Sequence, residues 1–277
     1  MPPVKVWIVL LTIMTFLTYR QIIECTRFKN NELLLNVGLE KVVHDYFMIL
    51  YPGDTFYFNN LVHKIDETEE INLKDVLHYS YNNEYITGEL RVYNNDLISV
   101  YGKLYRTAFI KDNSISFAST NYYDHSFNSM VYSVKGNYSK NDEAIILINR
   151  PYLQCDELTI NAFRESIVEF LHYVDFIDIM ESDKINNQKA AEVVLNYLQR
   201  GYACYNILFD RVNEEALKEC IKSIKTIIKK IPVSIMELIT YNFIKDGFYE
   251  SYNIYPIIEN NIMFQCTMYD FIRLTTP

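Results

Sequence analysis

The pattern of apolar and polar residues divides the chain into three parts. Residues 6–17 (VWIVLLTIMTFL) form an almost unbroken apolar run. Between residues 46 and 148, short stretches rich in apolar and aromatic residues alternate with Asn, Asp, Gly and Lys, as in strands joined by turns. After Pro151, apolar residues recur at the spacing of a helix. The pattern therefore predicts a leader segment, a strand-rich region and a helical region.

The N-terminal apolar run has the arrangement of a signal peptide. Lys5 supplies a positive charge before the run, and Arg20 ends the apolar stretch. The run is shorter than the roughly 20 residues of a membrane-spanning helix. Its end lacks the usual A-x-A cleavage pattern, and the best candidate is a cut after Cys25, before Thr26. We therefore predict a signal peptide over residues 1–25, with an uncleaved membrane anchor or a buried helix as the alternatives.

Residues 26–150 are expected to form a strand-rich region, arranged as an antiparallel meander or a small sandwich. The turn-forming residues Asn94, Asn95 and Asp96 lie between two alternating runs and predict a hairpin. Residues 65–78 are expected to form a short helix or an acidic loop. Strands are expected at residues 55–58, 89–93, 97–101, 104–110, 114–118, 130–134 and 144–148.

Residues 151–277 are expected to form a helical region of about four helices. Asp156 is the expected N-cap of the first helix, and Gly201 the expected end of the second. The apolar residues between Leu217 and Ile231 fall within one stripe of about 120°. The fold class is therefore α+β, with an antiparallel strand-rich N-terminal half and a helical C-terminal half; two domains and one domain both fit. Helices are expected at residues 156–180, 188–199, 214–231 and 233–245.

Composition and charge exclude several classes of function. With 49% hydrophobic and 15% aromatic residues, the chain is expected to fold rather than to be disordered. A formal net charge of -9 repels phosphate backbones, so nucleic acid is not an expected partner. The sequence contains no C-x-x-C, H-x-x-x-H or G-x-S-x-G spacing, and it predicts no metal ion, cofactor or catalytic residue.

The cysteines and one sequon fit the secretory pathway. Cleavage after Cys25 leaves an even number of cysteines, which predicts disulfides. The alternative is that some remain buried thiols, as on the apolar stripe of the 214–231 helix. Asn137 begins the sequence Asn-Tyr-Ser and is the candidate for N-glycosylation. The disulfide candidates are Cys155, Cys204, Cys220 and Cys266.

A row of lysines runs along one flank of the expected 214–231 helix. Such a row can receive an anionic ligand, a phosphorylated partner or a lipid headgroup. Charged helix flanks are common, so the alternatives are a solvated flank and a flank that neighbours the acidic segment of residues 156–200. The row consists of Lys218, Lys222, Lys225 and Lys229.

His172 lies three residues from Glu169 and three from Asp175. On a helix this spacing brings a carboxylate close to an imidazole and raises its pKa, although buried structural histidines show the same pattern.

These expectations favour a secreted, non-enzymatic interaction protein of the effector type, whose partner is another protein. The alternatives are a secreted hydrolase with a site that adjacent residues do not reveal, and a signal-anchored membrane protein. After cleavage of the leader the sequence predicts no stable membrane span. The oligomeric state stays open.

Overall fold

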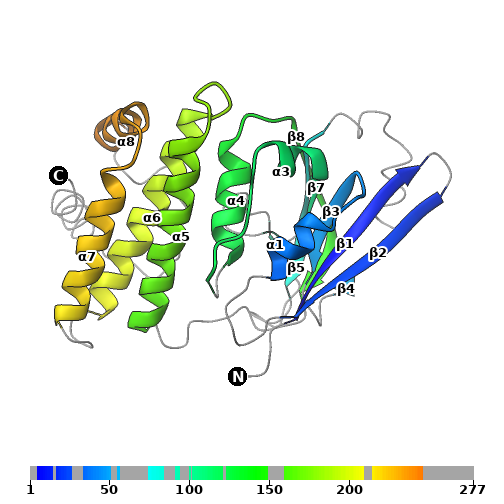
Figure 1. Cartoon of the computed structure of the whole chain (residues 1–277), viewed down its shortest axis with the longest axis horizontal. Helices are drawn as coiled ribbons and strands as arrows, with labels where there is room; N and C mark the ends of the chain where they lie inside the picture. The colour runs from blue at the N-terminus through cyan, green and yellow to red at the C-terminus, as the bar shows by residue number, and fades with distance from the viewer. Residues whose placement is uncertain are drawn as a thin grey trace. The chain divides into compact units, whose positions relative to one another are not determined.

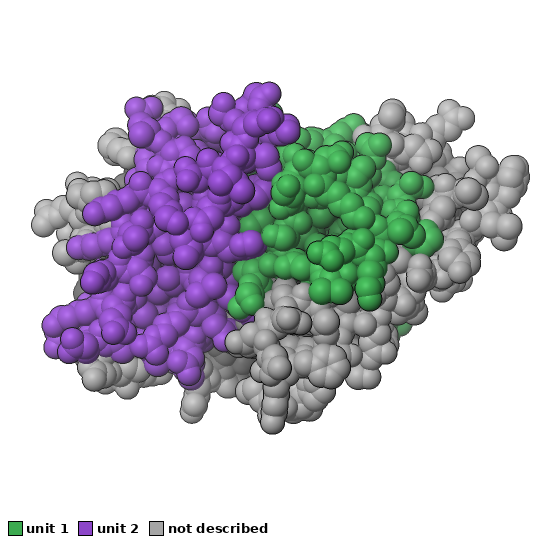
Figure 2. All heavy atoms as spheres, viewed as in Figure 1, with its two compact units in different colours: residues 1–119, 123–156 green, residues 120–122, 157–277 purple. Residues whose placement is uncertain are grey.

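The structure is a computed structural model that describes residues 5–14, 17–26, 34–50, 55–56, 74–83, 91–93, 100, 102–120, 123–148, 159–208 and 214–245. The chain divides into two compact units, shown in Figure 2. Unit 1 comprises residues 1–119 and 123–156, and unit 2 comprises residues 120–122 and 157–277.

Unit 1 is built on one mixed sheet, in which the structure describes eight strands (Figure 1). Their order is β2-β1-β3-β7-β5-β8-β4, and β6 pairs with β5 outside this path. The described pairs are antiparallel except for β5 with β8, which is parallel. The strands are β1 (Lys5–Met14), β2 (Leu17–Thr26), β3 (Tyr46–Leu50), β4 (Thr55–Phe56), β5 (Val76–Asn83), β6 (Arg91–Tyr93), β7 (Lys103–Arg106) and β8 (Tyr138–Ile148).

The N-terminal apolar segment forms a hairpin at one end of this strand order. β1 and β2 pair along their whole length, from Lys5 opposite Thr26 to Met14 opposite Leu17. The other side of β1 pairs with β3. Val, Ile and aromatic residues favour strands as well as apolar leaders. The residues that predict a signal peptide therefore have a second possible place, at the end of the sheet.

Three described helices accompany the sheet in unit 1: α1 (Leu34–Glu40), α3 (Thr107–Asp112) and α4 (Tyr123–Ser133). Buried aromatic rings link α4 to the sheet. Phe127 stacks on Phe117 with ring centroids 4.2 Å apart and meets Tyr105 of β7 edge-on at 5.3 Å. Tyr105 in turn packs against Phe47 of β3 at 5.5 Å. Each such pair adds about 0.5–1.5 kcal/mol beyond the area that it buries.

Unit 2 is helical throughout its described part, with α5 (Ile160–Ile179), α6 (Asn187–Leu208), α7 (Glu214–Ile228) and α8 (Val233–Lys245). The Thr159 side chain caps α5 by accepting a hydrogen bond from the Ala162 N–H at 3.2 Å. Tyr197 of α6 stacks on Phe170 and Tyr173 of α5, with centroids 5.0 and 5.8 Å apart. α5 also packs against α7, and α6 against α8.

The fold is α+β, with N-terminal strands followed by helices, but the expected strand-rich, antiparallel description is only partly right. Unit 1 contains helices, and its β5–β8 pair is parallel. The expected strands at residues 107–110 and 130–133 lie in α3 and α4, and residues 114–118 have no regular structure. Helix α4 is buried around most of its circumference. It therefore lacks the one-sided apolar period by which a helix is recognised.

Several boundaries also differ from those expected. Residues 76–78 belong to β5 rather than to a helix or acidic loop, and α6 continues through the buried Gly201 to Leu208. A glycine in a helix lowers stability without ending the helix when packing holds it. The expected helix end is therefore wrong there, whereas α8 has the expected bounds. The hairpin turn at 94–96, most of the strand expected at 97–101, and Pro151 and Asp156 lie outside the described residues. Helix α5 begins at Ile160 with Thr159 as its N-cap, so the expected N-cap Asp156 is wrong.

Candidate interaction site on helix α7

Helix α7 is strongly two-sided. Glu214 and Glu215 lie in its first turn and Lys225 in its last, so these charges complement the helix dipole. Its buried face packs in unit 2, where α7 contacts α5. A helix held in this way presents its remaining side chains at fixed positions. The buried residues are Leu217, Cys220, Ile224, Ile227 and Ile228.

Two ion pairs join the α7 region to α5. Arg164 Nη2 lies 3.3 Å from Glu219 Oε2, and Lys230 Nζ lies 2.7 Å from Asp175 Oδ1. All four side chains are substantially exposed, so each pair contributes about 0–1 kcal/mol. Their main effect is on charge, since they neutralise acidic and basic groups along this flank of α7.

Lys218, Lys222 and Lys225 of the lysine row lie on the exposed side of α7, and Lys229 is exposed in the turn just after it, because the helix ends at Ile228 and not at the expected residue 231. Lys218 Nζ lies 2.8 Å from Glu214 Oε1, and its hydrogen bond and positive charge lower the pKa of Glu214. Among the described residues, no carboxylate pairs with any of the other three lysines. Part of the row is therefore positive charge that the described part of the chain does not neutralise.

This arrangement suits an electrostatic contact. Residues 222 and 225 are separated by about 4.5 Å along the helix axis, at 1.5 Å per residue. Lysine ammonium groups act as point charges and bind carboxylates or phosphates without a fixed bidentate geometry. Because the apolar face of α7 is buried, the helix has no free apolar face to place in a lipid interface. An acidic, water-exposed surface is therefore the best complement of the row.

The carboxylates that flank His172 in the sequence both have other partners. Glu169 is fully buried, and its Oε1 accepts a hydrogen bond from Thr120 Oγ1 at 3.1 Å. Asp175 pairs with Lys230. The spacing along α5 therefore does not by itself reserve either carboxylate for the imidazole.

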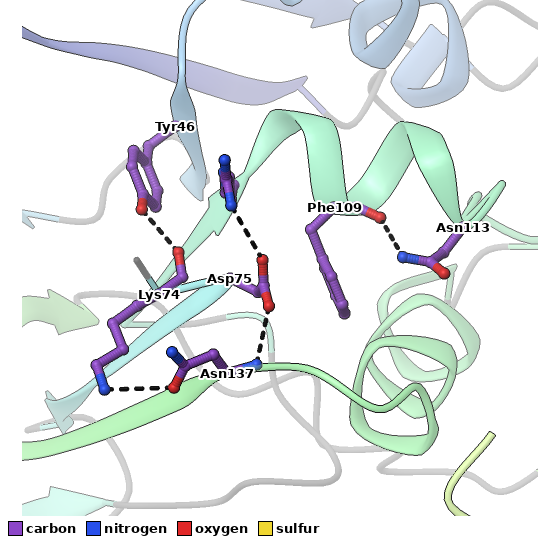
Figure 3. A network of polar contacts seen from close by, with 7 residues as sticks. Tyr46, Lys74, Asp75, Phe109, Asn113 and Asn137 are labelled. Atoms are coloured by element: carbon purple, nitrogen blue, oxygen red, sulfur yellow. Dashed lines mark hydrogen bonds and ion pairs between the residues drawn. The ribbon is translucent and has the colours of Figure 1, made fainter. Parts of the chain in front are cut away.

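The glycosylation candidate Asn137 is exposed and lies just before β8. Its backbone N–H donates to Asp75 Oδ2 at 2.8 Å, and its Oδ1 accepts from Lys74 Nζ at 3.3 Å (Figure 3). Asp75 also pairs with Arg106 at 3.5 Å. The Tyr138 hydroxyl, at the centre of the sequon, donates to the Val131 and Val134 carbonyls, and burial raises its pKa. The sequon thus begins at the surface and continues into a packed strand.

The structure places two of the four disulfide candidates. Cys204 lies on α6, Cys220 lies on the buried face of α7, and they are not joined to each other. Burial raises the pKa of the Cys220 thiol, with Arg164 acting weakly in the opposite direction. Cys155 and Cys266 lie outside the described residues. Pairings that involve them stay predictions.

Unit 1 contains a group of buried polar side chains that the sequence did not reveal. Lys103 Nζ donates to Asn128 Oδ1 at 2.8 Å, and His78 lies opposite Lys103 in the β5–β7 register. His125 is buried on α4 as well. The sheet register places His78 beside Lys103, and the Lys103 hydrogen bond reaches Asn128 on α4. The only sequence signal is a lysine preceding the apolar Leu104 and Tyr105. Their burial favours a structural role over one that needs access for a substrate.

The comparisons with known proteins give no match: no protein-family model, no curated protein and no solved structure. Within the described ranges, no group of three His, Cys, Asp or Glu side chains could hold a metal ion. None of the described helices has the length and apolar character needed to cross a membrane.

Proposed function

We propose that the protein is secreted after cleavage of residues 1–25 and binds another protein, with an acidic surface, through the lysine row of α7. The observation that carries the binding role is the exposure of Lys222, Lys225 and Lys229, to which the described residues offer no carboxylate. The buried face of α7 supports the proposal, because it fixes the spacing of these charges.

The row on its own contributes a limited affinity. An exposed lysine–carboxylate contact is worth about 0.2–1 kcal/mol, so the three open lysines supply about 1–3 kcal/mol. Charges of this kind mainly raise the association rate and select partners of opposite charge. The binding should therefore weaken strongly as salt rises, since salt screens exposed charges.

Secretion is tested by expressing the full chain in a eukaryotic secretory host and sequencing the N-terminus of the protein in the medium. A chain that begins at Thr26 supports the proposal. Material that stays in the cell, or that keeps residues 1–25, contradicts it.

Binding is tested with polyglutamate as an acidic protein surface and with anionic phospholipid vesicles as the competing class of ligand. Replacing Lys222, Lys225 and Lys229 with Gln should weaken polyglutamate binding at low salt by about 5-fold to 150-fold, the equivalent of 1–3 kcal/mol. The matched control replaces the exposed Lys41, Lys135 and Lys184 with Gln, which changes the net charge equally. Equal losses in the two variants, or tighter binding to the vesicles than to polyglutamate, would contradict a specific protein-binding row.

A further inference from the structure

The hairpin β1–β2 covers one side of β3, and the proposed cleavage would remove it. We propose that the mature chain then forms a dimer through β3, with two copies of Tyr46–Leu50 paired antiparallel across a two-fold axis at Met48. This inference rests on the proposed secretion, because cleavage after Cys25 removes the whole of β1 and nearly all of β2.

Strand β3 depends on β1 for most of its pairing. β1 pairs with all five residues of β3, from Trp7 opposite Leu50 to Leu11 opposite Tyr46. β7, on the other side, pairs only with Tyr46 and Phe47. Every residue of β3 is buried. Without β1, the strand would present unpaired N–H and C=O groups at the end of the sheet order, which is a template for another strand.

Strand β1, which pairs with this edge of β3, shows which residues fit there. It runs antiparallel to β3 and places the apolar residues 7–11 (WIVLL) opposite it. A second copy of β3 (YFMIL) has the same length of uncharged, apolar sequence. Two identical strands that pair antiparallel are related by a two-fold axis, which closes the assembly as a dimer. Self-pairing therefore needs no residue type that the edge does not already accept.

Two-fold symmetry allows several registers, and the one that overlaps all five residues of β3 places the axis at Met48. With Met48 on the axis, Phe47 lies opposite Ile49 and Tyr46 lies opposite Leu50. Cross-strand pairs of aromatic and aliphatic residues contribute about 0.2–1 kcal/mol each. Asp45, which is exposed just before β3, lies at opposite ends of the two strands in this register. The two carboxylates therefore do not face each other.

The register can be tested by cross-linking the secreted chain. Directly opposed residues in an antiparallel pair have Cα atoms about 4.5–5.5 Å apart, within the range that a disulfide can bridge. Met48→Cys should therefore give a covalent dimer on a non-reducing gel, and peptide mapping should join the two position-48 thiols. The matched control is Leu50→Cys, whose two copies would be about 13 Å apart at four residues of offset, too far for a disulfide.

A second variant keeps the hairpin in place. Cys25→Tyr puts a bulky residue at the last position of the leader, where cleavage requires a small one. Tyrosine also suits a strand, and position 25 pairs with Val6 in the hairpin. Light scattering should show a dimer for the cleaved wild-type chain and a monomer for the uncleaved variant. Amide exchange at residues 46–50 of the wild-type chain should become faster as the dimer is diluted.

Circular dichroism establishes that each variant is folded, which is needed because Met48 is fully buried and cysteine is smaller. A secreted chain that begins at Thr26 but is monomeric and does not cross-link at position 48 overturns the dimer and leaves secretion standing. Equal cross-linking at positions 48 and 50 also overturns it, since it indicates non-specific association. A secreted chain that keeps residues 1–25 overturns both proposals.

Discussion

At the scale of single residues, Gly136 lies where a larger side chain does not fit. A Cβ at this position would lie 2.8 Å from Cε2 of Phe109 and 3.3 Å from Cζ of Tyr138. The two rings meet edge-on with centroids 6.3 Å apart, so neither moves without displacing the other. We expect Gly136→Ala to lower the free energy of unfolding by about 1–3 kcal/mol, measured by urea denaturation. The exposed Asp112→Ala should change it by less than about 0.5 kcal/mol, and equal effects would count against this packing.

Tyr46 gives a prediction about alkaline stability. Its hydroxyl donates to the Lys74 carbonyl at 2.7 Å, and burial raises its pKa to about 12, against the lowering effect of Arg106. Because the folded-state pKa lies above the ordinary value of about 10, folding favours the neutral phenol. The stability that this supplies is complete below about pH 10 and is lost as the pH rises towards 12.

Tyr46→Phe removes both the hydrogen bond and the titration. We expect the variant to be less stable than the wild type at neutral pH by about 1 kcal/mol, because the Lys74 carbonyl loses its donor. The difference should shrink between about pH 10 and 12, because the wild-type phenol ionises there in the unfolded chain but not in the folded one. Urea denaturation of both proteins across this pH range measures the difference in stability. A difference that does not change with pH would show that Tyr46 does not titrate as described.

The sequence predicts individual residues best where function depends on a local pattern. The lysine row is readable because three- and four-residue spacing places the lysines on one flank of a helix. The hydrogen bonds of Lys103 to Asn128 and of Thr120 to Glu169 are not readable in this way. They join residues 25 and 49 positions apart, and only the tertiary structure brings them together.

At the scale of elements, α7 should owe its stability to its buried face and not to its lysines. Ile224 is 2% exposed, whereas Lys225 beside it is exposed. We expect Ile224→Ala to lower the free energy of unfolding by about 2–5 kcal/mol, through lost apolar burial and the cavity left behind. Lys225→Ala should change it by less than about 0.5 kcal/mol. Thermal and urea unfolding measure the loss of stability in each variant. A large loss from Lys225→Ala would show that the lysine row helps to hold the fold together.

The helices of unit 2 were predictable as elements because their apolar periods and the breaking Pro232 act locally, although the expected N-cap Asp156 and the expected end at Gly201 are wrong. Helix α3 was not, because its start depends on contacts with a distant segment. The Thr107 N–H donates to the Asp45 carbonyl at 2.8 Å, and the Thr107 hydroxyl donates to the His44 carbonyl. These bonds end β7 and begin the helix within an apolar run that reads as one strand. The contacts of Thr107 with residues 44 and 45 therefore override the local preference for a strand.

At the scale of the whole molecule, residues 5–26 have two incompatible uses. As a leader they are removed, and as β1 and β2 they cover β3. The α+β class follows from the sequence because the change of period near Pro151 separates strands from helices. The fate of the N-terminal segment does not follow in the same way, because apolar β-branched residues suit both a leader and a strand. If the leader is cleaved before unit 1 folds, β1 and β2 do not form. If unit 1 folds first, they cover β3.

The cysteines connect this choice to the chemistry of the whole chain. If cleavage occurs after Cys25, four cysteines enter an oxidising compartment, and we expect at least one disulfide. Cys220 is 2% exposed on α7, and the raised pKa of its thiol slows its reaction while the helix is packed. If Cys220 stays a thiol, the remaining three cysteines can form one disulfide and leave a second thiol.

Alkylation of the unfolded, unreduced secreted chain followed by mass spectrometry distinguishes these states. No labelled cysteine indicates two disulfides, and two labelled cysteines indicate one. When two are labelled, Cys220 should be among them and should react far more slowly in the folded chain than after unfolding, because the deprotonated thiol is the reactive form. Four labelled cysteines would contradict passage through an oxidising compartment, and a fifth would show that Cys25, and the leader with it, had been retained.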